Sequence, residues 1–119
     1  MSGRSPRWFR GIKYPKTTAT VIVKWATTTS NYGYVTIDGT KYKDVTTVEV
    51  PLGTEIAVTV RGASSSASKK CSISLNAETV QNGGGTYTFA ATGDATLTFS
   101  RHTNYTDDKQ YCKCVIVMG

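Results

Sequence analysis

Apolar and polar residues alternate along most of this chain, and that alternation restricts its fold more than any other feature. Val21, Val23 and Trp25 fall on one side of an extended segment. The same period of two recurs in residues 35–37, 48–50, 56–60, 71–75, 87–89 and 95–99. Alternation of this kind is typical of strands with one buried face, whereas an amphipathic helix needs apolar residues three and four positions apart. Because no segment after residue 16 has convincing helical spacing, the sequence predicts an all-β fold.

Short turn signals separate these runs, and they limit how the strands can be arranged. Asp38-Gly39 is a strong hairpin signal, since both central positions of a type I′ turn need positive φ. Seven or eight short strands in one open sheet would leave an apolar face in water, so they must pack as two layers or close on themselves. We therefore expect an antiparallel immunoglobulin-like β-sandwich of seven to eight strands with an extended N-terminal arm, and an all-β barrel is the alternative.

The final run, YCKCVIVM, is apolar on both sides in its second half. Cys112, Cys114 and Ile116 share one face of an extended chain, while Val115 and Val117 share the other with Lys113. A strand with two apolar faces is either central in its sheet or covered by another body. Both interpretations stay open: a closing strand in mid-sheet, or a strand that a neighbouring subunit covers.

Charge divides the chain into two parts. The chain has 14 basic and 8 acidic residues, and its first sixteen residues contain five of the basic ones and none of the acidic. The remainder is therefore close to neutral, and attraction to an anionic partner is expected only of the first segment. We interpret residues 1–16 as a basic, aromatic N-terminal arm and residues 17–119 as a single sandwich domain.

The arm has a regular pattern that suggests binding. Its basic residues recur at every third position, which places them along one edge of a polyproline II helix, a conformation that Pro6 and Pro15 favour. A short helix from Pro6 is the alternative, although Gly11 interrupts it. Tryptophan and arginine are enriched in binding hot spots. We expect partner-binding residues in the arm, and a solvated basic tail is the competing interpretation. These residues are Arg4, Arg7, Trp8, Phe9, Arg10, Ile12, Lys13, Tyr14 and Lys16.

No set of residues predicts catalysis, and the expected protein is not an enzyme. His102 is the one histidine and is predicted to lie in a solvated loop. Asp107 and Asp108 are adjacent, so in an extended chain they point to opposite sides and cannot form a paired acid/base site.

The three cysteines, Cys71, Cys112 and Cys114, lack the paired spacing of structural zinc sites. We expect them to be buried thiols, and no metal or cofactor is predicted. A bridge from Cys71 to Cys112 or Cys114 stays open for an oxidising medium.

Neither export nor membrane insertion is expected. The chain has no run of eighteen apolar residues that would span a bilayer. Its N-terminal segment has charge but lacks the apolar stretch of a secretory signal. The sequence therefore predicts a product made in the cytoplasm, with no membrane partner.

Residues 32–100 resemble the immunoglobulin-like β-sandwich modules of tailed-phage virion proteins and related bacterial surface repeats. The resemblance rests on three motifs: a hairpin, a Pro-Gly turn and a closing strand. They are Val35, Ile37, Asp38 and Gly39; Val50, Pro51, Gly53, Thr54 and Ile56; and Gly93, Asp94, Ala95, Thr96, Leu97 and Phe99. The resemblance implies a structural or adhesive module rather than a catalyst, and it covers neither the arm nor the final strand.

These observations lead to one functional hypothesis and two alternatives. The first is a virion structural protein, made in the host cytoplasm, whose arm docks onto neighbouring capsid or tail subunits in a homo-oligomer or larger assembly. The second is a nucleic-acid-binding protein that uses the arm. The third is a host-surface or glycan-binding module that uses aromatic residues near loops and strand ends. Those aromatic residues are Tyr32, Tyr34, Tyr42 and Tyr105.

Overall fold

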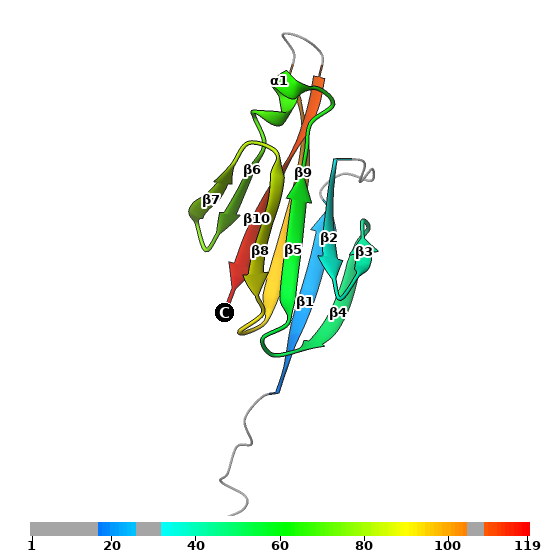
Figure 1. Cartoon of the computed structure of the whole chain (residues 1–119), viewed down its shortest axis with the longest axis vertical. Coiled ribbons are helices and arrows are strands. Elements are labelled where there is room, and N and C mark those ends of the chain that lie inside the picture. The colour runs from blue at the N-terminus through cyan, green and yellow to red at the C-terminus, as the bar shows by residue number, and fades with distance from the viewer. Residues whose placement is uncertain (1–16, 26–31, 105–108) are drawn as a thin grey trace, which may run out of the picture.

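The computed structural model describes residues 17–25, 32–104 and 109–119 of the 119-residue chain. Within these ranges the chain forms ten strands and one short helix, and the strands form two sheets (Figure 1). The elements are β1 (Thr18–Trp25), β2 (Gly33–Ile37), β3 (Thr40–Tyr42), β4 (Thr46–Pro51), β5 (Glu55–Val60), α1 (Ser65–Ser68), β6 (Ser72–Leu75), β7 (Glu78–Asn82), β8 (Gly85–Ala90), β9 (Ala95–Asn104) and β10 (Lys109–Met118). The prediction of an all-β fold is confirmed.

The two sheets form the layers of a sandwich-like body. The larger sheet has six strands in the order β4-β1-β9-β10-β6-β7, and the smaller has four in the order β3-β2-β5-β8. In Figure 1, β5 and β8 of the smaller sheet lie in front of β9 and β10 of the larger. Inward-facing residues of both sheets belong to one cluster of buried side chains. The described body therefore has two packed layers, as expected when each sheet has one apolar face.

The core is built from the alternate residues that the sequence indicates. Val21 and Val23 of β1, with Val58 of β5, have no exposed surface. Phe99 of β9 is the largest fully buried side chain, and its ring stacks on that of Trp25 with the centroids 4.9 Å apart. No polar or charged side chain is buried among the described residues. Among the described residues, those buried in this cluster lie between positions 19 and 116.

The predicted turns form where the sequence places them. Asp38 and Gly39 have φ of 50° and 81° and join β2 to β3, which is the positive-φ pair that a type I′ hairpin needs. Gly53 has φ of 91° in the turn from β4 to β5. The hairpin and Pro-Gly motifs of the sequence are thus formed by turn and strand residues in this fold.

Three details of the predicted architecture are corrected. The described ranges contain ten strands rather than seven or eight, because β3 and β7 are additional short strands. Two pairings, β1 with β9 and β10 with β6, are parallel, so the sandwich is not wholly antiparallel. The segment after β5 contains the single turn of helix α1, capped by the side chain of Ser64, which accepts a hydrogen bond from the amide of Ala67.

Local sequence signals explain these errors. A hairpin turn in the sequence indicates only that two consecutive strands pair antiparallel. Strands β1 and β9 pair although about seventy residues separate them in the sequence, so no local signal indicates their parallel direction. A four-residue helix is too short to produce a 3.6-residue period.

Candidate docking surface

All the predicted partner-binding residues lie outside the described part of the chain. They are Arg4, Arg7, Trp8, Phe9, Arg10, Ile12, Lys13, Tyr14 and Lys16. The structure describes the chain from Thr17 onward. The carbonyl oxygen of Thr17 accepts a hydrogen bond from the amide of Leu52 at 3.0 Å, and Thr18 pairs with Pro51 of β4. The arm therefore joins the body at the start of β1, on the larger sheet.

The strand β10 is central in the larger sheet, between β9 and β6, which is one of the two interpretations left open. Its inward residues Cys112, Cys114 and Ile116 are buried. Its outward residues Val115 and Val117 are 46% and 58% exposed. Both sides of this strand are thus apolar, and no described residue covers the outer one.

Strand register places these valines beside apolar and methyl-bearing neighbours. Ile22 of β1 pairs with Thr96 of β9, which pairs with Val117. In the next row Thr98 of β9 pairs with Val115. Ile22 is half-buried and, like the valines, lies on the side of its strand opposite the core. Ile22, Thr96, Thr98, Val115 and Val117 together form the surface that we call the β10 outer face.

Charged groups lie at the margins of the β10 outer face. Lys24 of β1 stands at the β1 side of the Thr98–Val115 row, and Lys113 stands in the next row toward one end of the sheet. The ammonium of Lys113 is 6.0 Å from the ring centre of Tyr111. Glu49 is exposed on the neighbouring β4, and Asp94 Oδ1 accepts a hydrogen bond from the amide of Thr20 at 2.9 Å. The centre of the face is apolar, so it favours an apolar ligand with charge at its edges.

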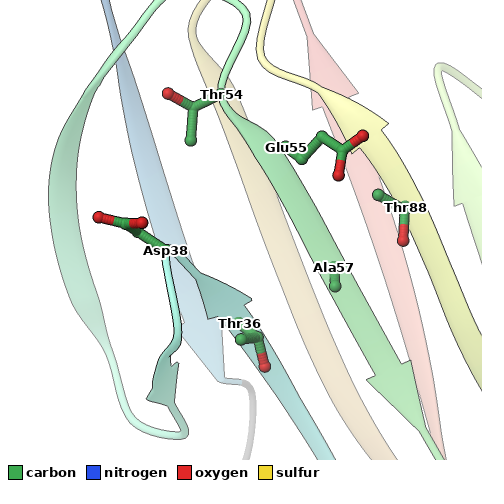
Figure 2. Close-up of a pocket in the computed structure, with 6 residues that line it drawn as sticks. All are labelled: Thr36, Asp38, Thr54, Glu55, Ala57 and Thr88. Atoms are coloured by element: carbon green, nitrogen blue, oxygen red, sulfur yellow. The ribbon is translucent and has the colours of Figure 1, made fainter.

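The smaller sheet has a shallow hollow of about 370 Å³ on its outer side (Figure 2). The small side chain of Ala57 in β5 lies among longer neighbours and leaves this space. The lining residues are Thr36, Asp38, Thr54, Glu55, Ala57 and Thr88. Figure 2 shows the carboxylates of Asp38 and Glu55 pointing in different directions, so they do not converge on one ligand. No local pattern in the sequence indicates this hollow, because its residues come from separate strands.

No metal site is formed by the described residues, among which no group of three or more His, Cys, Asp and Glu could hold an ion.

His102 corrects a prediction. It lies in β9 rather than in a solvated loop, and it is half-buried. Its ring stacks on Tyr111 with centroids 5.3 Å apart, and Nε2 is 3.1 Å from Ser100 Oγ. Strand β9 continues beyond the alternating residues 95–99 because β9 and β10 form a long hairpin. Within this hairpin His102 pairs with Tyr111. Asp107 and Asp108 lie outside the described residues.

The cysteines are free, buried thiols, as predicted. Burial raises the pKa of all three, and the pKa of Cys112 rises to about 12 through burial and then through the nearby Cys71. A thiol that stays protonated is a poor nucleophile and a poor metal ligand. These residues therefore act as small apolar side chains in the core.

Of the tyrosines predicted to bind a glycan, the three that the structure describes each pack against the core or lie against a cation. Tyr32 and Tyr42 are partly buried against the core. The ammonium of Lys41 lies 4.2 Å from the ring centre of Tyr34, and the guanidinium of Arg61 lies 5.3 Å from that of Tyr32. Each cation takes up one face of a ring that a sugar or base would otherwise stack on. Tyr105 lies outside the described residues.

Among the described residues no helix is long and apolar enough to cross a membrane. Comparisons of the chain with protein-family models, curated proteins and solved structures gave no match.

Proposed function

We propose that this chain is a non-enzymatic structural protein of a phage virion, an immunoglobulin-like sandwich docked through residues 1–16 onto neighbouring capsid or tail subunits. Such a protein would act as a capsid decoration, minor capsid or tail component. The observation that supports this most is that the described residues of both sheets form one continuous buried cluster among themselves. In this proposal the large apolar residues of the arm, Trp8, Phe9 and Ile12, meet a partner rather than completing the core of the body.

The composition of the arm suggests a role for each type of residue. Trp8 and Phe9 would fill pockets on a neighbouring subunit, as aromatic anchors commonly do. The five basic residues would pair with acidic side chains or with packaged nucleic acid. An arm of this kind adds affinity by linking separate contacts, since its second contact forms at high effective concentration.

The fold supports a module of the phage sandwich type. The hairpin at Asp38-Gly39 and the turn at Gly53 have the backbone conformation that the shared motifs require. The body is two-layered and almost wholly β. The predicted sandwich is antiparallel, and we propose that this chain is a variant of that type in which two strand pairs, β1–β9 and β10–β6, are parallel.

The described body is less suited to the two alternatives. A sequence-independent nucleic-acid protein needs a basic groove, whereas the charge of residues 17–119 is close to zero. A glycan-binding platform needs open aromatic faces, whereas Tyr32 and Tyr34 each lie against a cation.

Deletion of residues 1–16 tests the proposal. Tagged full-length and arm-deleted chains would be produced during growth of the phage whose genome carries the gene, and mass spectrometry would quantify each in purified particles. We expect the full-length chain in the particles and the arm-deleted chain, although folded by circular dichroism, to be lost from them. Absence of the full-length chain, or equal incorporation of both, would refute the proposal.

Duplex DNA binding with a steep salt dependence that disappears with the arm would instead indicate the nucleic-acid function. Glycan binding that persists without the arm would indicate the adhesive one.

A further inference from the structure

The β10 outer face is an apolar surface that only another layer can cover. Val115 and Val117 are 46% and 58% exposed in a strand whose two edges are already paired. An added strand cannot bury them, because β9 occupies one edge of β10 and β6 the other as far as Ile116. Beyond Ile116, Asn76 takes the second edge, since its amide donates to the carbonyl of Ile116 and its Oδ1 accepts from the amide of Met118. Only a segment or body that packs on the face of the sheet removes these side chains from water.

The arm has the chemistry to be that segment. In polyproline II geometry its basic residues occupy one edge, which leaves Phe9 and Ile12 on a second edge and Trp8 and Tyr14 on a third. The two apolar edges can then lie on the sheet while the basic edge faces water. Lys24, in the row of Thr98 and Val115, and Lys113, in the next row, would then lie beside the apolar edges and away from the basic edge.

The spacing of the arm also matches the face. Phe9 and Ile12 are one polyproline turn apart, about 9 Å. Ile22 and Val117 lie in one row and are separated by β9 alone, a lateral distance of about 10 Å. One apolar edge of the arm can thus contact both side chains at once.

The point where the arm joins the body favours a neighbour over its own sheet. Thr17 continues the pairing of β1 with β4, since its carbonyl accepts from the amide of Leu52. Pro15 has a fixed φ and favours an extended conformation at Tyr14. A chain that stays extended upstream of Thr17 leads away from its own sheet, and sixteen residues span at most about 50 Å.

We propose that the arm of one copy packs through Trp8, Phe9 and Ile12 on the β10 outer face of a second copy. This inference rests on the proposed docking role of the arm and identifies its partner as another molecule of the same chain. This exchange of arms between copies explains both why β10 is apolar on its outer side and why a nearly neutral body has an aromatic, cationic arm. Two such contacts in a symmetric pair, or a continuing series of them, would build an assembly.

Four full-length proteins test the exchange by sedimentation equilibrium over a range of concentrations. They are the wild type, Val115→Thr/Val117→Thr, Trp8→Ala/Phe9→Ala, and the control Val45→Thr, whose valine is 68% exposed in the β3–β4 connection. We expect the wild type and the control to associate equally. Each double variant should have its dissociation constant raised by roughly tenfold or more, since a methyl or an aromatic group is lost from a buried contact.

Mixing the two double variants provides the sharper result. Val115→Thr/Val117→Thr retains an intact arm, and Trp8→Ala/Phe9→Ala retains an intact β10 outer face. An equal mixture should therefore regain association that neither variant has alone. A wild type that remains monomeric overturns the inference, including the case in which the arm covers its own face. So does a Val115→Thr/Val117→Thr protein that associates as strongly as the wild type. If circular dichroism shows that this variant is unfolded, Val117→Thr alone replaces it.

Failure of the exchange is distinguishable from failure of the proposed function. If Trp8→Ala/Phe9→Ala lowers incorporation into particles while Val115→Thr/Val117→Thr does not, the arm docks on another protein and only the exchange is refuted. If none of the arm variants changes incorporation, the docking role itself is refuted.

Discussion

Two hairpin turns in this protein have similar positive φ values but different residues at the second turn position. Substituting glycine in one turn and alanine in the other should change the free energy of unfolding in opposite directions. Asp38 and Gly39 have φ of 50° and 81°, while Asn76 and Ala77 between β6 and β7 have φ of 49° and 70°. The second turn therefore holds an alanine in the left-handed conformation that favours glycine. We predict that Ala77→Gly stabilises the protein and that Gly39→Ala destabilises it.

The expected size follows from two opposing backbone terms. A left-handed conformation costs an L-residue about 1–2 kcal/mol, while glycine loses about 0.5–1 kcal/mol more than alanine when the chain folds. The net gain for Ala77→Gly is therefore about 0.5–1 kcal/mol, and Gly39→Ala should lose a similar amount. A Cβ at Gly39 would have no heavy atom within 4 Å, so its effect comes from the backbone alone.

Thermal and urea unfolding monitored by circular dichroism measure both changes. For a body of about 100 residues, 1 kcal/mol corresponds to about 4 °C in Tm, so we expect Ala77→Gly to raise Tm by roughly 2–4 °C. Ala90→Gly, at an exposed position of β8, is the control and should lower Tm because the strand needs no positive φ. A lower Tm for Ala77→Gly, or a higher one for Gly39→Ala, would refute the reasoning.

Two further predictions concern the core around Cys112. A Cβ on Gly33 would lie 2.9 Å from both Cys112 Sγ and Phe99 Cδ1, so Gly33→Ala should lower the free energy of unfolding by about 1–3 kcal/mol. Combining it with Cys112→Ala should cost at least about 0.5 kcal/mol less than the sum of the single changes, and additive losses in urea unfolding would contradict the clash. Because burial raises the pKa of Cys112 to about 12, the folded thiol keeps its proton above pH 9 while the unfolded one, with a pKa of about 8.5, loses it. Stability should therefore fall by roughly 1.4 kcal/mol per pH unit for this group between those values, and the same slope in Cys112→Ala would show that another group is responsible.

The alternation of apolar residues was sufficient to predict the main strands, because each has one face in the core. Every run identified in the sequence forms a strand. The two additional strands lack that signal for physical reasons. β3 is three residues long, and β7 has no buried residue and follows the Asn76-Ala77 turn. That turn lacks the glycine by which a hairpin is normally recognised.

Features that depend on distant parts of the chain were beyond local reasoning. The parallel pairing of β1 with β9 joins residues 21–25 to residues 95–99, and neither segment indicates the direction of the other. His102 looks like a loop residue because its neighbours are polar, yet the length of the β9–β10 hairpin places it in a strand against Tyr111. The predicted binding residues of the arm lie outside the described residues, so their role stays a prediction.

The final strand shows how two interpretations of one pattern can be compatible. A segment apolar on both sides is expected to be either central or covered, and β10 is central. A central position accounts for its buried side, Cys112, Cys114 and Ile116, but it does not require Val115 and Val117, because threonine would pair in the sheet equally well. Threonine does occupy the adjacent outward positions of β9, Thr96 and Thr98. The sheet itself accommodates either residue, whereas the proposed contact with the arm of a second copy requires valine at the two β10 positions.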